Sequence, residues 1–327
     1  MAKALCLADE YTMPISPIMA LGAGICSALA VFSIVFGSVA ALPLFYLAPL
    51  PLYLAGLGIG SKGVLLASAA AIGTAALIGG VYAALPFAVA YVMPSFVACR
   101  QALRTFPGRN GQAAWTGPGD VAGTFTVMGA VGLMFAAFTV MMDSNVGPLA
   151  DAVSGFLTTA LDKMGGGRMP VESRDALVVG LAPYFPGMAV SSWVLMHIFN
   201  AIGAQAALVK SGRNIRPSVS YSDLSVPDWC SWLLVGAGVV TLVGSDDWSY
   251  LGRNMVIVAL VPFFLVGLAV VHTFAKRIAG GMGLLVVFYI LLLVLVWAAF
   301  VVAGAGVVEQ WVGLSKRMGP PLNEESE

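Results

Sequence analysis

The chain has 327 residues, of which 59% are hydrophobic and only 10% are charged. A soluble domain carries about a quarter charged residues, which it needs to cover its core with polar surface. The 16 basic and 16 acidic residues cancel, so the charge gives no indication of a nucleic-acid partner. The composition therefore predicts a protein whose apolar surface faces a lipid bilayer.

Long apolar segments follow one another along the chain, and a membrane-spanning helix needs about 20 such residues. We expect an all-α, polytopic transmembrane helix bundle of eight or nine spans in a single membrane domain over residues 1–317, with a disordered acidic tail at 318–327. The segment 84–99 decides between eight and nine, because it is short and holds Pro86 and Pro94. The predicted spans are 18–39, 42–59, 64–82, 84–99, 121–142, 187–209, 229–243, 254–273 and 282–304.

Basic residues gather in alternate connections between these spans. The positive-inside rule places such connections in the cytoplasm, which puts the N-terminus inside and the acidic connections outside. The basic residues concerned are Arg100, Arg104, Arg109, Lys210, Arg213, Arg216, Lys276 and Arg277.

One extracytoplasmic connection has a helical pattern of its own. Pro148 can open a helix, apolar residues repeat at helical spacing from Val153 to Met164, and Gly165–Gly167 ends the pattern. We predict an amphipathic interfacial helix on the membrane surface. It is either a packed connector or a lid over a substrate pocket.

The sequence lacks the motifs of the common enzymes and pumps. It contains no P-loop, no H-E-x-x-H and no G-x-S-x-G, and its two histidines, His197 and His272, have no nucleophile assigned to them. Every Asp and Glu falls in a connection or at a helix end, which disfavours an ion-coupled carrier. We therefore expect no enzyme activity, no cofactor and no metal site.

The second span is interrupted by prolines. Within Leu42–Gly60, Pro49 and Pro51 each remove a helical hydrogen bond, and the freed carbonyls need a partner at membrane depth. Broken helices of this kind form binding sites in transporters. The alternative is a plain kink.

Two polar residues share a face of the sixth span. His197 and Asn200 lie three residues apart. They either hydrogen-bond a neighbouring helix or point into the bundle as ligand groups. On the second interpretation, the candidate solute-binding residues are Pro49, Pro51, His197 and Asn200.

Small residues recur every fourth position in the third span, at Ala67, Ala71, Ala75 and Gly79. Such a ridge lets another helix approach closely. It is a candidate contact surface for a partner subunit, and internal packing is the other possibility.

Four segments carry a resemblance in their order and spacing: LPLFYLAPLPLYLAGLGIG at Leu42–Gly60, SGRNIRPS at Ser211–Ser218, the entry to a span at Val226–Trp229, and GLAVVH at Gly267–His272. Together they resemble the YybS-like family of bacterial polytopic membrane proteins of uncharacterised function. The resemblance implies a multi-pass protein of the bacterial cytoplasmic (inner) membrane. The chain departs from the family pattern at Glu309 and Ser315, where the pattern favours Asp and Arg.

That family looks distantly similar to the substrate-binding membrane subunits of energy-coupling-factor transporters, which bind a vitamin or metal and depend on separate ATPase and coupling subunits. The resemblance implies a transport-related subunit that binds a small solute, has no energy source of its own and contacts the lipid bilayer and other membrane-protein subunits. The alternative is a membrane scaffold that recruits partners through its cytoplasmic loops at Arg100–Gly119 and Lys210–Asp228.

Overall fold

The computed structural model describes residues 17–36, 41–107, 113–165, 169–218, 224–278, 280–295 and 297–313. The predicted acidic tail at 318–327 lies outside these ranges. Contacts group the chain into two compact units, one of Met1–Val121 with Leu195–Val219 and one of Ala122–Val194 with Ser220–Glu327. Helix α10 (Phe185–Lys210) contributes residues to both. The single membrane domain over 1–317 stays a prediction.

The polytopic helical architecture is confirmed, whereas the count of eight or nine spans is not. Six helices are long and apolar enough to cross a membrane, or seven if one sharply bent pair counts as a span. They are Pro17–Val35, Ala41–Ile59, Ser61–Ala102, Pro118–Met141, Phe185–Lys210 and Asp246–Ala275. In the described part of the chain the sheet is one antiparallel hairpin, β1 (Thr105–Pro107) with β2 (Ala113–Trp115).

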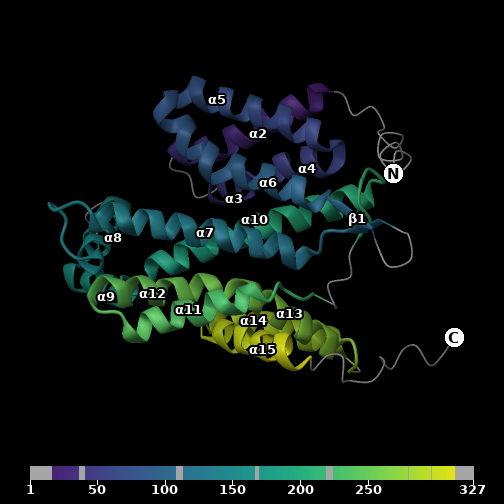
Figure 1. The fold of residues 1–327 in the computed structure, drawn as a ribbon. Coiled ribbons are helices and arrows are strands. Elements are labelled where there is room, and N and C mark those ends of the chain that lie inside the picture. Colours follow the sequence, from purple (N-terminus) through teal and green to yellow (C-terminus); the bar gives the residue numbers. More distant parts are fainter. Residues whose placement is uncertain are drawn as a thin grey trace. The chain divides into compact units, whose positions relative to one another are not determined.

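The first unit is built on close contact between two helices that lie alongside each other in Figure 1. A Cβ at Gly24 in α2 would collide with the Ala67 carbonyl oxygen in α5, so the two backbones touch. Ala67, Ala71 and Ala75 are fully buried, and Gly79 at the end of the ridge is exposed. The ridge therefore packs within the chain. The helices of this unit are α2 (Pro17–Phe32), η1 (Ser33–Phe36), α3 (Ala41–Leu47), α4 (Leu50–Ile59), α5 (Ser61–Phe87), η2 (Ala88–Val92) and α6 (Met93–Ala102).

The helical run Ser61–Ala102 folds back on itself. Gly80 has φ 69° and ψ −171°, which is not helical. A Cβ at Gly56 would lie 3.2 Å from Cβ of Val64 and 2.8 Å from Cβ of Cys99. A straight helix would hold those two residues about 50 Å apart at about 1.5 Å per residue, so the chain reverses near Gly80.

The predicted spans 64–82 and 84–99 correspond to the two limbs of this hairpin. No loop joins the two limbs, because the chain is helical on both sides of Gly80. The π-helical stretch η2 lies in the second limb.

The second unit contains two antiparallel helix pairs, α11 with α12 and α13 with α15 (Figure 1). A Cβ at Gly267 would collide with the Val302 carbonyl oxygen and one at Gly306 with that of Phe263, so α13 and α15 run in contact. The helices of this unit besides the start of α10 are α7 (Pro118–Met141), α8 (Leu149–Gly165), α9 (Val171–Leu181), α11 (Trp229–Val243), α12 (Asp246–Ala259), α13 (Val261–Ala275), α14 (Gly281–Val294) and α15 (Ala298–Val312).

The predicted span 282–304 falls on two helices and is not confirmed as a single one. Helices α14 and α15 are bent by 119° across the short break between Val294 and Ala298. Two glycine contacts hold α15 along α13, so the chain must turn before α15 begins. The preceding span begins at Asp246 rather than at 254, because α12 continues almost directly into α13.

The hairpin depends on the positive φ of Gly80, and this dependence can be tested. Gly80→Ala forces a side chain into a conformation that glycine alone adopts readily, and we expect it to destabilise the protein by about 1–3 kcal/mol. Gly73→Ala is the matched control, because Gly73 lies in the same helix and a Cβ there meets nothing within 4 Å. The measurement is thermal unfolding of each purified variant. Equal melting temperatures for the two variants would contradict a reversal at Gly80.

Candidate functional site

A helix occupies the connection for which the sequence predicted one. Helix α8 packs several of its apolar residues against protein. Leu157 forms a buried cluster with Val178 and Ala182, and Leu149 joins a second cluster that includes Tyr250 and Leu251. These contacts agree with the packed-connector interpretation, and they also place α8 over a hollow.

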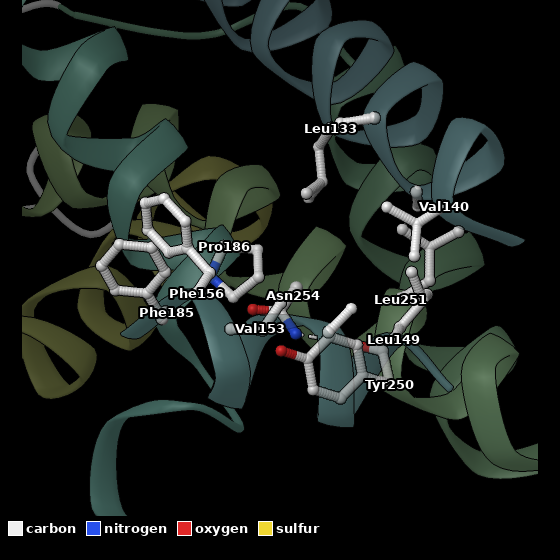
Figure 2. A pocket seen from close by; sticks show the side chains of 13 residues that line it. Leu133, Val140, Leu149, Val153, Phe156, Phe185, Pro186, Tyr250, Leu251 and Asn254 are labelled. Atoms are coloured by element: carbon white, nitrogen blue, oxygen red, sulfur yellow. Dashed lines mark hydrogen bonds between the residues drawn. The ribbon is translucent and has the colours of Figure 1, made fainter. Parts of the chain in front are cut away.

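Four helices surround a cavity of about 250 Å³ (Figure 2). Helix α7 forms one wall, α12 another and α8 a third, while the start of α10 completes it. The lining residues are Leu133, Ala136, Ala137, Val140, Leu149, Ala152, Val153, Phe156, Phe185, Pro186, Tyr250, Leu251 and Asn254. A cavity bordered by α8 is what the lid interpretation of this helix requires.

Asn254 is fully buried and holds the beginning of α10 in place. Its Oδ1 accepts a hydrogen bond from the Gly187 amide at 2.8 Å, and its Nδ2 donates to the carbonyls of Pro183 at 3.1 Å and Tyr250 at 2.9 Å. The first amides of a helix have no partner within it. Asn254 lies inside α12 and caps the start of another helix, α10.

The cavity wall offers hydrocarbon, because its polar groups are engaged elsewhere. The Tyr250 hydroxyl donates to the Ala182 carbonyl at 2.6 Å, and both Nδ2 hydrogens of Asn254 bind carbonyls. The remaining lining residues are aliphatic, aromatic or proline. A polar solute would lose its water there without gaining a hydrogen-bond donor, so the cavity suits an apolar group.

Helix α8 is tied to its neighbours at both ends. The Leu149 amide donates to Oδ1 of Asp247 at 2.8 Å, which caps the start of α8 from α12. Arg174 on α9 pairs with Asp162 near the other end at 3.0 Å and with Asp175 at 2.9 Å. The hydrogen bonds that Arg174 donates to Asp162 and Asp175 raise the pKa of its guanidinium above the ordinary value. This exposed pair adds little stability, so the cap is the firmer attachment.

Asn200 and His197 bond the two helices on either side of the predicted proline break, α3 and α4. In the first unit, Nδ2 of Asn200 donates to the Tyr46 carbonyl at 2.9 Å, in the last turn of α3. Helix α4 begins after Pro49, which is fully buried, and Pro51 lies in its first turn. Asn200 thus donates a hydrogen bond to a carbonyl that lies beside the predicted proline break.

His197 hydrogen-bonds a backbone carbonyl near a second proline, Pro94. Its Nε2 lies 2.9 Å from the Ala90 carbonyl oxygen, and its Nδ1 lies 2.8 Å from the Tyr53 hydroxyl. A carbonyl only accepts, so Nε2 carries the proton and Nδ1 accepts from Tyr53. Ala90 lies one turn before Pro94, which has no N–H to donate. The buried histidine therefore supplies a donor at a place where proline removes one.

These bonds give His197 and Asn200 a structural role in joining broken helices. Asn200 Oδ1 is buried without a hydrogen-bond partner, and a solute role for the four residues stays a prediction. Within the described residues, no group of three His, Cys, Asp or Glu side chains is placed to hold a metal ion.

The apolar spans, the long helices and their internal packing define a polytopic helical membrane protein. The chain belongs to the family described as Predicted membrane protein (DUF2232), which matches residues 25–309. No curated protein and no solved structure matches the chain.

The role of His197 can be tested by restoring the missing backbone donor. His197→Leu leaves the Ala90 carbonyl without the imidazole, and we expect a loss of about 1–3 kcal/mol in the free energy of unfolding. Pro94→Ala returns an N–H one turn away, so the double variant should lose less than the sum of the two single variants. The measurement is a double-mutant cycle on denaturant unfolding.

His272→Leu is the control for that cycle, because Nδ1 of His272 is bonded to the Leu268 carbonyl of its own helix. It should be less destabilising than His197→Leu. Additive effects of His197→Leu and Pro94→Ala would contradict the assigned role.

Proposed function

We propose that the protein is a transport-related membrane subunit that binds a small apolar solute in the cavity beside α8 and has no energy source of its own. The single observation that carries the proposal is a cavity walled by hydrocarbon and bordered by a surface helix. The proposed solute site lies among α7, α8 and α12. The sequence had instead predicted it at Pro49, Pro51, His197 and Asn200.

The size of the cavity supports a small ligand. Pockets that hold drug-sized molecules measure about 300–1,000 Å³, and this cavity measures about 250 Å³. It fits a compact apolar molecule or a segment of a longer chain. Burying such a group contributes about 0.8 kcal/mol for each CH₂.

The position of α8 supports exchange of that ligand. The Phe156 side chain borders the cavity and is 60% exposed, so it stands at the edge rather than in the core. The ion pair between Arg174 and Asp162, which joins α8 to α9, is exposed and therefore a weak attachment.

The coupling to transport rests on the sequence. The chain has no P-loop, so movement of the solute across the membrane would be driven by partner subunits, as in the energy-coupling-factor transporters that the YybS-like family resembles. Unlike those vitamin- or metal-binding subunits, the chain would take an apolar solute.

A scaffold in the bacterial inner membrane is the second candidate, and one observation favours it. Arg216 is buried and donates to the carbonyls of Ala102 and Thr116, each at 3.1 Å. It thereby joins parts of the two connections predicted to be cytoplasmic, Arg100–Gly119 and Lys210–Asp228, into one folded surface. Stoichiometric co-purification of cytoplasmic proteins, together with failure to bind apolar ligands, would support this candidate.

A photoreactive alkyl probe tests the solute proposal on protein in lipid nanodiscs. We expect saturable labelling of α7, α8 and α12 that excess unlabelled alkane abolishes, above an unsaturable background on lipid-facing helices. Ala137→Trp should reduce the saturable part several-fold, because it places an indole in the cavity. Peptide mass spectrometry locates the labels.

Two phenylalanines provide a milder matched pair for the same experiment. Phe156→Ala removes a ring that borders the cavity and should weaken saturable labelling, whereas Phe135→Ala removes a ring that is 71% exposed and absent from the lining. If labelling is uniform along all apolar helices and unaffected by Ala137→Trp and Phe156→Ala, the proposal is wrong.

A further inference from the structure

Arg253 is a cation inside a candidate membrane span, Asp246–Ala275. Its guanidinium carbon lies 5.7 Å from the ring centroid of Tyr184 and 5.8 Å from that of Tyr250. Its Nε is buried and has no hydrogen-bond partner. Across the described residues, the ion pairs are those of Arg174 with Asp162 and Asp175, so no carboxylate of that part neutralises Arg253.

Two tyrosine rings stabilise this charge and leave its buried Nε without a hydrogen-bond acceptor. Aromatic faces attract a guanidinium by roughly 0.5–2 kcal/mol, yet a guanidinium has five N–H donors and no acceptor. A charged residue within the membrane is costly and is typically retained for function. An anion that accepts bonds from Arg253 would remove both deficits.

The cation lies beside the cavity. Tyr250 lines the cavity and also contacts the guanidinium of Arg253. Tyr184, which also lies against the guanidinium, directly precedes two further lining residues, Phe185 and Pro186. The Tyr250 ring therefore lies against both the apolar cavity and the positive charge.

Three acidic groups on the surrounding helices have partners of their own. Asp247, on the same helix as Arg253, accepts a hydrogen bond from the Leu149 amide. Asp162 and Asp175 bind Arg174. No described carboxylate forms an ion pair with Arg253, so an external anion can take that position.

We propose that the cavity and Arg253 bind one anionic amphiphile, with its alkyl chain in the cavity and its phosphate or carboxylate on the guanidinium. This inference rests on the proposed function and names the ligand class for the same site. It predicts selection by head-group charge, which a cavity alone does not provide.

The test compares two photoreactive probes with the same alkyl chain, a fatty acid and the corresponding alcohol, on protein in phosphatidylcholine nanodiscs. A charged hydrogen bond lost from a desolvated site corresponds to roughly a tenfold change in affinity. We therefore expect wild-type protein to reach half-saturation with the acid at about one tenth of the alcohol concentration.

Arg253→Gln should raise the half-saturating concentration of the acid to that of the alcohol and leave the alcohol unchanged. Arg100→Gln is the matched control, because Arg100 also stacks on an aromatic ring, that of Phe96 at 5.7 Å, and lies in the other unit. It should keep the preference for the acid. The wild-type comparison needs no variant, so poor folding of Arg253→Gln leaves the test intact.

Equal half-saturation of acid and alcohol in wild-type protein would overturn the amphiphile inference while supporting the proposed function. Saturable labelling by neither probe would overturn both. If the preference survives in Arg253→Gln, Arg253 extends to water at the membrane surface and does not bind the head group. Displacement of the acid by inorganic phosphate at the same concentration would indicate a site for free anions instead.

Discussion

Backbone groups in a bilayer need partners inside the protein, and this requirement governs the structure wherever a helix is interrupted. Water is absent from the hydrocarbon region, so each unsatisfied amide or carbonyl costs several kcal/mol (about the value in an apolar solvent). Asn200 meets the requirement beside the proline break at Pro49, His197 before Pro94 and Asn254 at the start of α10. These three buried polar side chains thus join one helix to another.

The same economy of polar groups explains the chemistry of the cavity. Asn254 and Tyr250 line the cavity, and their N–H and O–H groups donate to backbone carbonyls. The remaining surface is hydrocarbon and is bordered by α8, which a cap at Leu149 and an exposed ion pair at Asp162 join to its neighbours. Arg253 differs from these residues, because its charge has aromatic contacts and lacks a carboxylate among the described residues. An amphiphile would complete both features at once.

Local patterns in the sequence predicted much of this fold, and long-range packing supplied the rest. Apolar runs marked the helices, Pro49 marked a break, and Pro148 with the helical spacing after it marked α8. No glycine or proline lies between Val294 and Ala298, so no local pattern predicted the turn between α14 and α15. Contacts between α13 and α15 impose that turn. The cavity joins helices more than 100 residues apart, so no local pattern reports it. The predicted span began at residue 254, so the sequence did not place Arg253 inside a span.

The most direct test of the account is an experimental structure of the protein in lipid nanodiscs by electron cryomicroscopy, at a resolution that shows side chains and bound lipid. The account predicts elongated density between α7, α8 and α12, ending at the guanidinium of Arg253. A cavity filled by the protein's own side chains, with α8 packed directly on α7 and Arg253 paired with a carboxylate of the chain, would contradict it.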